Sequence, residues 1–378
     1  MQNNSITVLY DHQIFSMQKF GGISRYFSEL YMQFVKTQGI EVRLTTLNIQ
    51  NIYMKDILNI KNQRNLRRQF NGNPKANYVV NIIPSYKEIL LGQYSVLHPT
   101  YYGCYYKTAC KSKPIIITAH DFTHEKYPEF FIKPSRNYKL KSQSFQISSK
   151  IIAISENTKL DLINYYNVDP NKITVIYHGN SLKSSNTYNN KDPNEMYLPN
   201  RYILYVGARD GYKNFVQLLR AYAQMTVNDD NLLLVCAGGG DLKENEVRFI
   251  NDLGLQNKIV HFQPSDRHLV KLYENALAFI FPSFYEGFGM PILEAMSCHC
   301  PVILSNRSAL PEIAENAGVY FEPNDEDDIR KAIESVIYSD SKRKEMINKG
   351  LDRSEHFSWE TTAVKTKEVY LKAIEEEK

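Results

Sequence analysis

The sequence predicts an α/β protein made of two successive domains, each with a parallel β-sheet covered by helices. Short apolar runs alternate with helical segments along the chain, a pattern typical of parallel strands joined by crossover helices. A polar stretch interrupts this alternation near the middle, and the pattern then starts again. The chain has 378 residues, too many for one ordinary core, and suits two domains of roughly 180 residues each.

The first domain is expected over residues 1–182. It opens with an apolar strand, and a loop containing Gly21 and Gly22 leads into a helix over residues 23–36. Its strands are predicted at residues 6–10, 41–44, 78–83, 95–98, 115–119, 151–155 and 173–177. Residues 183–200 are polar, rich in Asn and Ser, and contain two prolines, so they form the predicted linker.

The second domain is expected over residues 201–357 and repeats the alternation. Its strands are predicted at residues 202–206, 232–237, 259–262, 278–281 and 302–304. Ser358 then opens a last helix, over residues 358–378, with apolar residues at helical spacing: Trp359, Ala363, Tyr370 and Ile374. Because this helix has one apolar face to bury, we expect it to return to the first domain.

The composition indicates a soluble, globular protein. Apolar residues make up 43% and charged residues 23% of the chain. No window approaches the 18 or more apolar residues that a membrane-spanning helix needs, and no signal peptide is evident. The five cysteines are few and odd in number, so we expect reduced thiols in a cytoplasmic protein.

Charge is distributed unevenly along the chain. The net charge is +11 over residues 1–195 and −7 over the remainder. Two basic clusters contribute to the first value: Lys61, Arg64, Arg67 and Arg68, and Lys133, Arg136, Lys139 and Lys141. They fit either an anionic membrane surface or pyrophosphate-linked acceptor, or a plain solvated helix face. Nucleic acid is not expected, because neither cluster lies in a recognisable binding module.

The segment Phe281–Val302 carries the densest chemistry. Glu286 and Glu294 stand eight residues apart, with two glycines and Pro291 between them. A buried strand is expected to end here in a tight turn, and Pro291 suits the first turn of the following helix, where we also expect Glu294. Unpaired amides and the positive end of the helix dipole make this turn suitable for a diphosphate-bearing ligand.

These motifs together resemble the retaining glycosyltransferases of family 4. The most specific match is EGFGMPILE at residues 286–294, which is similar to the family's E-x7-E signature. Further matches, in order along the chain, are FGGISRYF (20–27), TAHD (118–121), YVGARDGYKN (205–214), AGGGDL (237–242) and ALPEIA (309–314). The resemblance implies the GT-B fold, in which two Rossmann-like domains face each other across a cleft.

The same resemblance implies an activity. The chain would transfer a hexose from a nucleotide diphosphate sugar to a sugar or lipid-linked acceptor, in polysaccharide or glycoconjugate biosynthesis, with retention of configuration. UDP-hexose is slightly preferred over GDP-mannose as donor. We expect no cofactor and no metal, and a cytoplasmic protein that contacts the inner face of the membrane peripherally through its basic first domain.

The site residues follow from the matched motifs. We expect a leaving diphosphate to need fixed cations, supplied by Arg209 and Lys213, although these stand four residues apart where the common family spacing is five. His120, at a strand end, would lie beside the donor sugar, and Glu286 would contact sugar hydroxyls. The predicted donor-binding residues are Gly21, Gly22, Gly207, Gly239, Gly287, Phe288, Gly289, Met290, Glu294 and Leu310.

Several alternative interpretations are weaker. Asp325 and Asp327 match a D-x-D metal motif but open a helix, where acids serve the dipole. The run Cys298–Cys300 lacks a second pair of ligands for zinc, and its His299 replaces a glycine usual in the family. A Rossmann oxidoreductase is disfavoured because the glycine fingerprint at Gly238 breaks at Lys243. A non-catalytic sugar-nucleotide-binding partner, a phosphorylase and a hydrolysing epimerase stay open.

Overall fold

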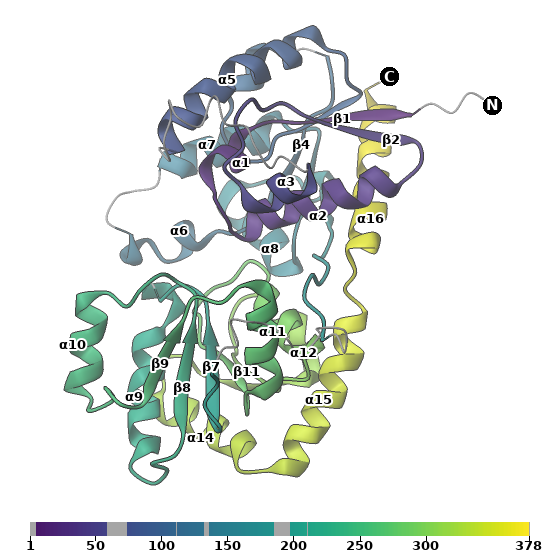
Figure 1. The fold of residues 1–378 in the computed structure, drawn as a ribbon. Helices are drawn as coiled ribbons and strands as arrows, with labels where there is room; N and C mark the ends of the chain where they lie inside the picture. Colours follow the sequence, from purple (N-terminus) through teal and green to yellow (C-terminus); the bar gives the residue numbers. More distant parts are fainter. Residues whose placement is uncertain are drawn as a thin grey trace. The chain divides into compact units, whose positions relative to one another are not determined.

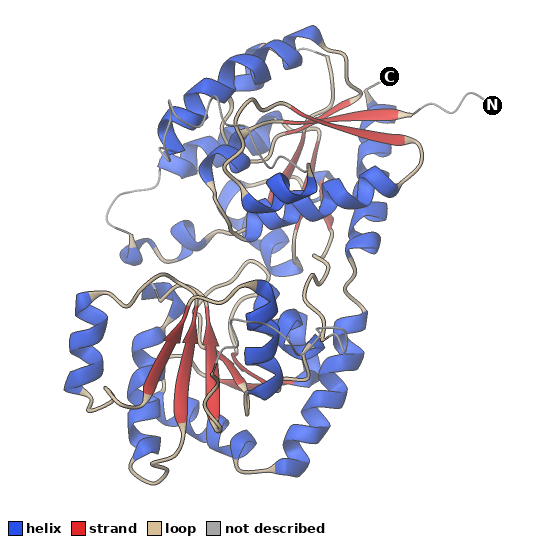
Figure 2. Cartoon of the chain, viewed as in Figure 1, coloured by secondary structure: helices blue, strands red, loops and turns tan. Residues whose placement is uncertain are grey.

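The computed structural model describes residues 5–58, 74–110, 112–131, 136–184, 197–209 and 211–377. The chain divides into two compact units (Figures 1 and 2). Unit 1 contains described residues within 1–125, 133–179 and 358–378, and unit 2 those within 126–132 and 180–357. Each unit is a parallel sheet flanked by helices, as the alternation of strand and helix predicts.

Unit 1 contains two three-stranded parallel sheets, with strand orders β2-β1-β3 and β4-β5-β6. A parallel bridge between Leu97 and Ile115 links them into one continuous layer. The strands are β1 (Ile6–Tyr10), β2 (Ile40–Leu44), β3 (Val96–His98), β4 (Ile116–Ala119), β5 (Lys150–Ala153) and β6 (Ile173–Val175).

The helices of unit 1 cover this layer. They are α1 (Gln13–Met17), α2 (Gly22–Lys36), α3 (Ile52–Ile57), α5 (Pro74–Leu91), α6 (Thr123–Lys126), α7 (Arg136–Ile147), α8 (Glu156–Tyr166) and α16 (Trp359–Glu376), with 3-10 turns η1 (Tyr105–Thr108) and η3 (Pro170–Lys172). Ser358 caps α16 by accepting a hydrogen bond from the Thr361 amide, and α16 lies beside α2 (Figure 1). The last helix therefore packs in unit 1, where Tyr370 is fully buried.

Unit 2 has one six-stranded parallel sheet in the order β12-β11-β10-β7-β8-β9. Its strands are β7 (Tyr202–Val206), β8 (Leu233–Ala237), β9 (Ile259–Phe262), β10 (Phe279–Phe281), β11 (Val302–Ser305) and β12 (Gly318–Phe321). Its helices are α9 (Phe215–Thr226), α10 (Glu244–Asp252), α11 (Asp266–Asn275), α12 (Met290–Ser297), α13 (Leu310–Ala314), α14 (Glu326–Ile337) and α15 (Asp340–Glu355). Shorter 3-10 turns are η2 (Pro128–Phe130), η4 (Gly211–Lys213) and η5 (Glu315–Ala317).

One predicted strand is wrong. Residues 78–83 lie inside the helix α5, which buries Asn77, Asn81 and Ser85 and exposes Val79 and Ile83. The Asn81 side chain accepts hydrogen bonds from two loop amides and donates to Ser16 and to the Asn48 carbonyl. Because the residues buried in this part of the helix are polar, the apolar residues between them gave a pattern that resembles a strand. The edge strand β12 was not predicted at all.

The unit boundaries differ from the predicted domain boundaries in two places. The change of unit falls between Gly179 and Asn180, and residues 126–132, assigned by sequence to the first domain, are grouped with unit 2. The predicted linker lies largely outside the described residues, at 185–196. Within the described ranges, no helix combines the length and the apolar character needed to cross a membrane.

Buried histidines in unit 1 give the fold a predicted pH dependence. Burial lowers the pKa of His98 and of His120 to about 3, from 6.5, and also lowers the pKa of His12 and His178. Below pH 6.5 the unfolded chain gains protons that the folded chain does not. The contribution of these histidines to the free energy of unfolding is therefore fully present above pH 6.5. It falls as the pH drops toward 3, by up to about 1.4 kcal/mol per pH unit for each histidine.

We expect the urea midpoint to be lower at pH 5.5 than at pH 7.5, a window in which ordinary carboxylates stay ionised. His120→Asn should reduce this difference because it removes one site of proton uptake. His356→Gln, which changes an exposed histidine, should leave it unaltered. Equal midpoints at the two pH values in the wild type would contradict the prediction.

Candidate active site

The strand order of unit 2 places a topological switch point between β7 and β10. These strands are neighbours in the sheet, yet the chain leaves them toward opposite directions, to β8 and to β11. In open parallel sheets, ligands bind outside the carboxyl ends of the strands at such a point. The loop after β7 holds Arg209 and Lys213, and the loop after β10 holds Glu286, so the fold brings these predicted residues to one place.

Lys213 and Glu286 form an ion pair at this switch point. The Lys213 Nζ lies 2.6 Å from Glu286 Oε1, and the two side chains are 17% and 14% exposed. The Phe284 amide donates to the Tyr212 carbonyl at 2.9 Å, which ties the two loops together one residue before Lys213. The pair is thus held in place while remaining accessible to solvent, as a ligand-contacting charge must be.

The helix α12 begins directly after the Glu286 loop. Gly289 precedes it with φ of 95°, a left-handed conformation that favours glycine, and a Cβ there would lie 3.0 Å from Ile292 and 3.1 Å from Leu310. Met290 and Pro291 form the first positions of the helix, as predicted for Pro291. Pro291 has no N–H and the Ile292 amide donates to the Gly289 carbonyl at 2.9 Å, so the Met290 amide is the candidate ligand donor at this helix start, four residues after Glu286.

The structure corrects the position of Glu294. It is the fifth residue of α12, so it lies in the second turn rather than the first. The residue is 7% exposed, and its carboxylate accepts a hydrogen bond from the Tyr273 hydroxyl at 3.3 Å. Tyr273, from α11, therefore orients the carboxylate, a role that the sequence motif does not reveal.

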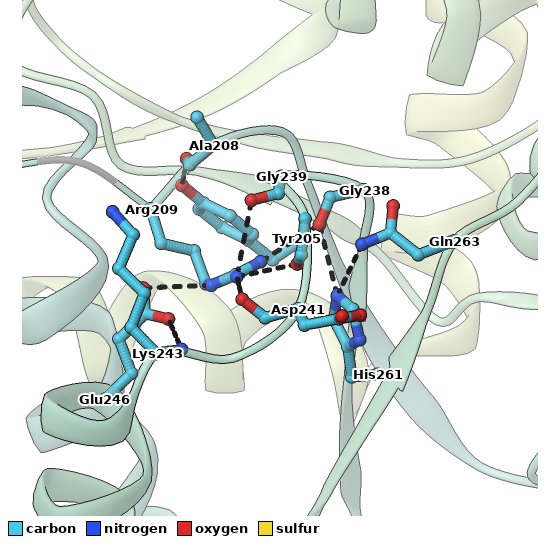
Figure 3. Close-up of polar contacts among 11 residues, drawn as sticks. Tyr205, Ala208, Arg209, Gly238, Gly239, Asp241, Lys243, Glu246, His261 and Gln263 are labelled. Carbon is cyan, nitrogen blue, oxygen red and sulfur yellow. Dashed lines mark hydrogen bonds and ion pairs between the residues drawn. The ribbon is translucent and has the colours of Figure 1, made fainter.

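Arg209 shapes the neighbouring glycine turn (Figure 3). Its guanidinium donates to the Gly238, Gly240 and Asp241 carbonyls at 2.9, 2.9 and 3.0 Å, and its Nε pairs with Glu246 at 3.0 Å. The side chain is only 1% exposed. These contacts occupy the donors that we expected to face a phosphate, so in this conformation Arg209 holds protein backbone instead.

The turn that Arg209 holds has three successive left-handed glycines. Gly238, Gly239 and Gly240 have φ of 77°, 74° and 75°, which residues with a side chain rarely adopt. A Cβ on Gly239 would also collide with the Gly207 carbonyl. The two predicted donor-binding glycines are therefore in close backbone approach, at the carboxyl ends of β7 and β8.

The predicted residues of the first half lie in unit 1 and form a separate group. Gly22 is the first residue of α2, and the Gln18 side chain accepts a hydrogen bond from the Ser24 amide at 3.3 Å at this helix start. A Cβ on Gly21 would lie 2.6 Å from that Gln18 oxygen. One turn later the Tyr26 ring packs edge-on against His120, with centroids 5.3 Å apart.

His120 directly follows β4, as predicted. Its residue is 5% exposed, and its Nε2 has no hydrogen-bond partner among the described residues. Burial lowers its pKa to about 3, so the imidazole is neutral at pH 7. A buried neutral histidine whose ring nitrogen lacks a partner can form one hydrogen bond with a ligand hydroxyl.

The structure describes only part of the two basic clusters of the first half. Lys61, Arg64, Arg67, Arg68 and Lys133 lie outside the described residues. Lys141 is not a solvated or membrane-facing charge: its side chain is 4% exposed, pairs with Glu125 at 3.1 Å and donates to the Asp121 carbonyl at 2.8 Å. Lys139 is exposed.

Two sequence signals that we set aside have structural roles. Asp325 caps α14 by accepting hydrogen bonds from the Asp327 and Asp328 amides. His299 takes φ of 59° just after α12, where glycine is favoured, and the Cys300 amide donates to the Ala295 carbonyl in the motif that closes the helix. Among the described residues, no group of three or more His, Cys, Asp or Glu is arranged to hold a metal, and all five cysteines are free.

Sequence reasoning missed the residues that support the site. The Ser308 hydroxyl accepts a hydrogen bond from the Glu286 amide at 2.9 Å. Glu246, which balances Arg209, also accepts from the Lys243 amide at 2.7 Å. The Ser308–Glu286 and Arg209–Glu246 contacts join positions more than 20 residues apart, so no local pattern could reveal them, whereas the Lys243–Glu246 contact is a local cap at the start of α10.

Two models of known families match the chain. The model of "Glycosyltransferase Family 4" matches residues 20–183, and the model of "Glycosyl transferases group 1" matches residues 187–353. The first match contains His120, and the second contains the residues at the β7–β10 switch point.

Individual proteins are similar to this chain over much of its length. O-antigen chain mannosyltransferase B of Escherichia coli is 29% identical over 309 residues, 75% of this chain and 80% of that protein. O-antigen chain mannosyltransferase RfbU of Salmonella typhimurium is 32% identical over 221 residues, 58% of this chain and 60% of that protein. The solved sucrose-phosphate synthase of Thermosynechococcus elongatus superposes with a TM-score of 0.72 at 18% identity, covering 97% of this chain and 98% of that one. The chain belongs to glycosyltransferase family 4 and has the GT-B fold.

Proposed function

We propose that this glycosyltransferase transfers a hexose from a nucleotide diphosphate sugar to a sugar or lipid-linked acceptor, with retention of configuration, during polysaccharide synthesis. The observation that carries the proposal is the accessible Lys213–Glu286 pair at the switch point, next to the start of α12. A cation, helix amides and a carboxylate side by side can bind the diphosphate and the sugar hydroxyls of one donor.

The proposed chemistry depends on the leaving diphosphate. The bond between the anomeric carbon and the β-phosphate oxygen breaks, while the acceptor hydroxyl oxygen bonds to the same face of that carbon. The hydroxyl proton passes to the departing phosphate oxygen. Negative charge grows on the diphosphate during this step, so Lys213 and the Met290 amide stabilise the transition state more than the ground state.

The two glutamates have separate proposed roles. Glu286 accepts hydrogen bonds from hydroxyls of the donor sugar, and its pairing with Lys213 holds it in place. Glu294 accepts from the ribose diol, since one carboxylate offers two oxygens to two hydroxyls. Its partner Tyr273 fixes the orientation needed for that contact. His120, neutral and with a buried Nε2 that lacks a partner among the described residues, is proposed to bind a hydroxyl of the transferred sugar.

Unit 1 is proposed to bind the acceptor. Its strand order has a switch point between β1 and β3, and a cavity of about 480 Å³ there is lined by residues that follow these strands, including Gln13, Met17, Tyr101 and Gly103. Tyr78 also lines it and supplies an aromatic face suited to a sugar ring. Lys75 also lines the cavity, and together with the basic composition of the first half it favours an acceptor that carries phosphate.

The donor is the finer question. UDP-hexose is the expectation from the sequence, whereas the relatives that are named mannosyltransferases favour GDP-mannose. A thermal-shift screen of UDP, GDP and their sugars should find one nucleotide that raises the melting temperature. The best donor should then release free nucleotide only when an acceptor sugar is present. Nucleotide release without acceptor would favour a hydrolysing epimerase, and binding without any transfer would favour a non-catalytic partner protein.

Transfer is expected to proceed without metal. The acidic run at Asp325 is used to cap α14, and Lys213 supplies the positive charge that a metal would otherwise bring. Activity should therefore persist in excess EDTA, measured as nucleotide release with the best donor. Loss of activity that magnesium or manganese restores would contradict this prediction.

A further inference from the structure

A short segment from the first half of the chain packs on the loops of the donor site. We call residues 126–131 the aromatic strap; it contains η2 and is grouped with unit 2. The rings of Tyr127, Phe130 and Phe284 form a mutual stack, with centroids 5.9 to 6.1 Å apart and interplanar angles from 10° to 29°. The Tyr127 hydroxyl also donates to the Phe284 carbonyl at 3.4 Å.

The strap touches both loops that carry the Lys213–Glu286 pair. Phe284 stands two residues before Glu286, and Lys126 lies over the ring of the intervening Tyr285 at 5.3 Å. On the other loop, the centroid of the Phe131 ring lies 6.2 Å from that of Tyr212, the residue before Lys213.

The Phe130 ring packs on Gly211, the first residue of η4. A Cβ on Gly211 would lie 2.5 Å from Phe130 Cδ1 and 3.1 Å from its Cε1, closer than carbon atoms approach. The absence of a side chain at Gly211 therefore lets Phe130 pack directly on the turn that presents Lys213.

The base of the strap is fixed in unit 1. Glu125, the residue before the strap, has a side chain only 2% exposed, paired with the buried Lys141 at 3.1 Å. The Tyr166 hydroxyl donates to the same carboxylate at 2.5 Å. Both Lys141 and Tyr166 therefore bond the carboxylate of the residue from which the strap begins.

We propose that the aromatic strap positions the donor-site cation: Tyr127 and Phe130 hold η4 and the Phe284 loop so that Lys213 stays beside Glu286. The inference rests on the proposed function, because it takes Lys213 to bind the donor diphosphate. Phe130 is 38% exposed, so its ring adds little to the core of unit 2, and its packing serves the geometry of the turn. Small errors in the placement of a catalytic charge are costly, at about 100-fold for 1 Å.

The test is a double-mutant cycle on Phe130 and Gly211. Phe130→Ala is expected to lower kcat/KM for the donor about tenfold or more, with a melting temperature close to that of the wild type. Phe130→Tyr should restore activity because it keeps the ring. Gly211→Ala alone should also lower activity, since its methyl displaces Phe130, but it should add little to Phe130→Ala.

Each result has a distinct meaning. Full activity of Phe130→Ala, or losses that simply multiply in the double variant, would overturn the role of the strap. Tyr197→Ala, which removes an aromatic side chain that is 87% exposed, is the matched control and should leave kcat/KM unchanged. Calorimetry with UDP and GDP separates the two proposals: a wild type that binds neither refutes the proposed function, whereas equal binding and turnover of wild type and Phe130→Ala refutes only the strap.

Discussion

Lys213→Ala is expected to lower the turnover of sugar transfer by about two orders of magnitude or more, the scale for removing a charge contact that acts in the transition state. The Lys213 ammonium lies 2.6 Å from Glu286 in a site that solvent reaches, so a bound diphosphate can share it. Because negative charge grows on the diphosphate as the bond breaks, kcat and kcat/KM should fall together.

The remaining variants separate charge from packing at this position. Lys213→Arg keeps a positive charge and should retain part of the activity, while its planar fork fits the place of an ammonium imperfectly. Lys349→Ala removes a lysine from an exposed pair with Glu345 on α15 and should have no effect on turnover. Near wild-type turnover in Lys213→Ala would remove Lys213 from the active site.

Arg209→Ala is expected to destabilise unit 2 by about 3 kcal/mol, because breaking a buried ion pair leaves its partners unsatisfied. The change would remove the ion-pair partner of Glu246 and one donor from each of three carbonyls of the glycine turn. Arg209→Lys should rescue little, since one ammonium cannot replace the divergent donors of a guanidinium. Urea unfolding measures the effect, and the donor KM reports whether the glycine turn is still formed.

The same experiment distinguishes two roles for Arg209. A residue that binds phosphate directly would lose activity on substitution while the melting temperature stayed the same. A residue that holds the turn would lose stability together with activity. Arg330→Ala is the matched control: this arginine pairs with Asp327 and Glu334 on the surface of α14, and its loss should cost about 1 kcal/mol or less.

The strands of unit 2 could be predicted well, and the reason is their burial. A parallel strand covered on both faces is apolar along its whole length, so β7 has the predicted bounds and β8, β10 and β11 differ by one residue at one end. The edge strand β9 also has the predicted bounds, although none of its residues is fully buried, because three of its four residues are apolar. The edge strand β12 was not predicted; it is only four residues long, begins with Gly318, and buries only Phe321.

The helix α5 shows the opposite failure. Its buried face carries Asn77, Asn81 and Ser85, whose side chains bond to loops of unit 1. An apolar residue at these positions could not satisfy those loop groups, so hydrogen bonding determines the face of this helix rather than hydrophobicity. A prediction based on apolar period alone cannot identify such a helix.

By itself, the sequence determined the alternation of buried strands and helices, the glycine-rich turn before α12, and the residue types gathered near Glu286, because each depends on local conformation or on simple burial. Only the tertiary structure decided what those side chains touch. In the folded protein Arg209 donates to a glycine turn, whereas Lys213 stays accessible beside Glu286. Glu294 lies in the second turn of its helix, bonded to Tyr273, and the aromatic strap packs on Gly211. The physical reason is that a hydrogen bond or ring contact depends on the distance between atoms from remote segments, which packing fixes and local sequence does not.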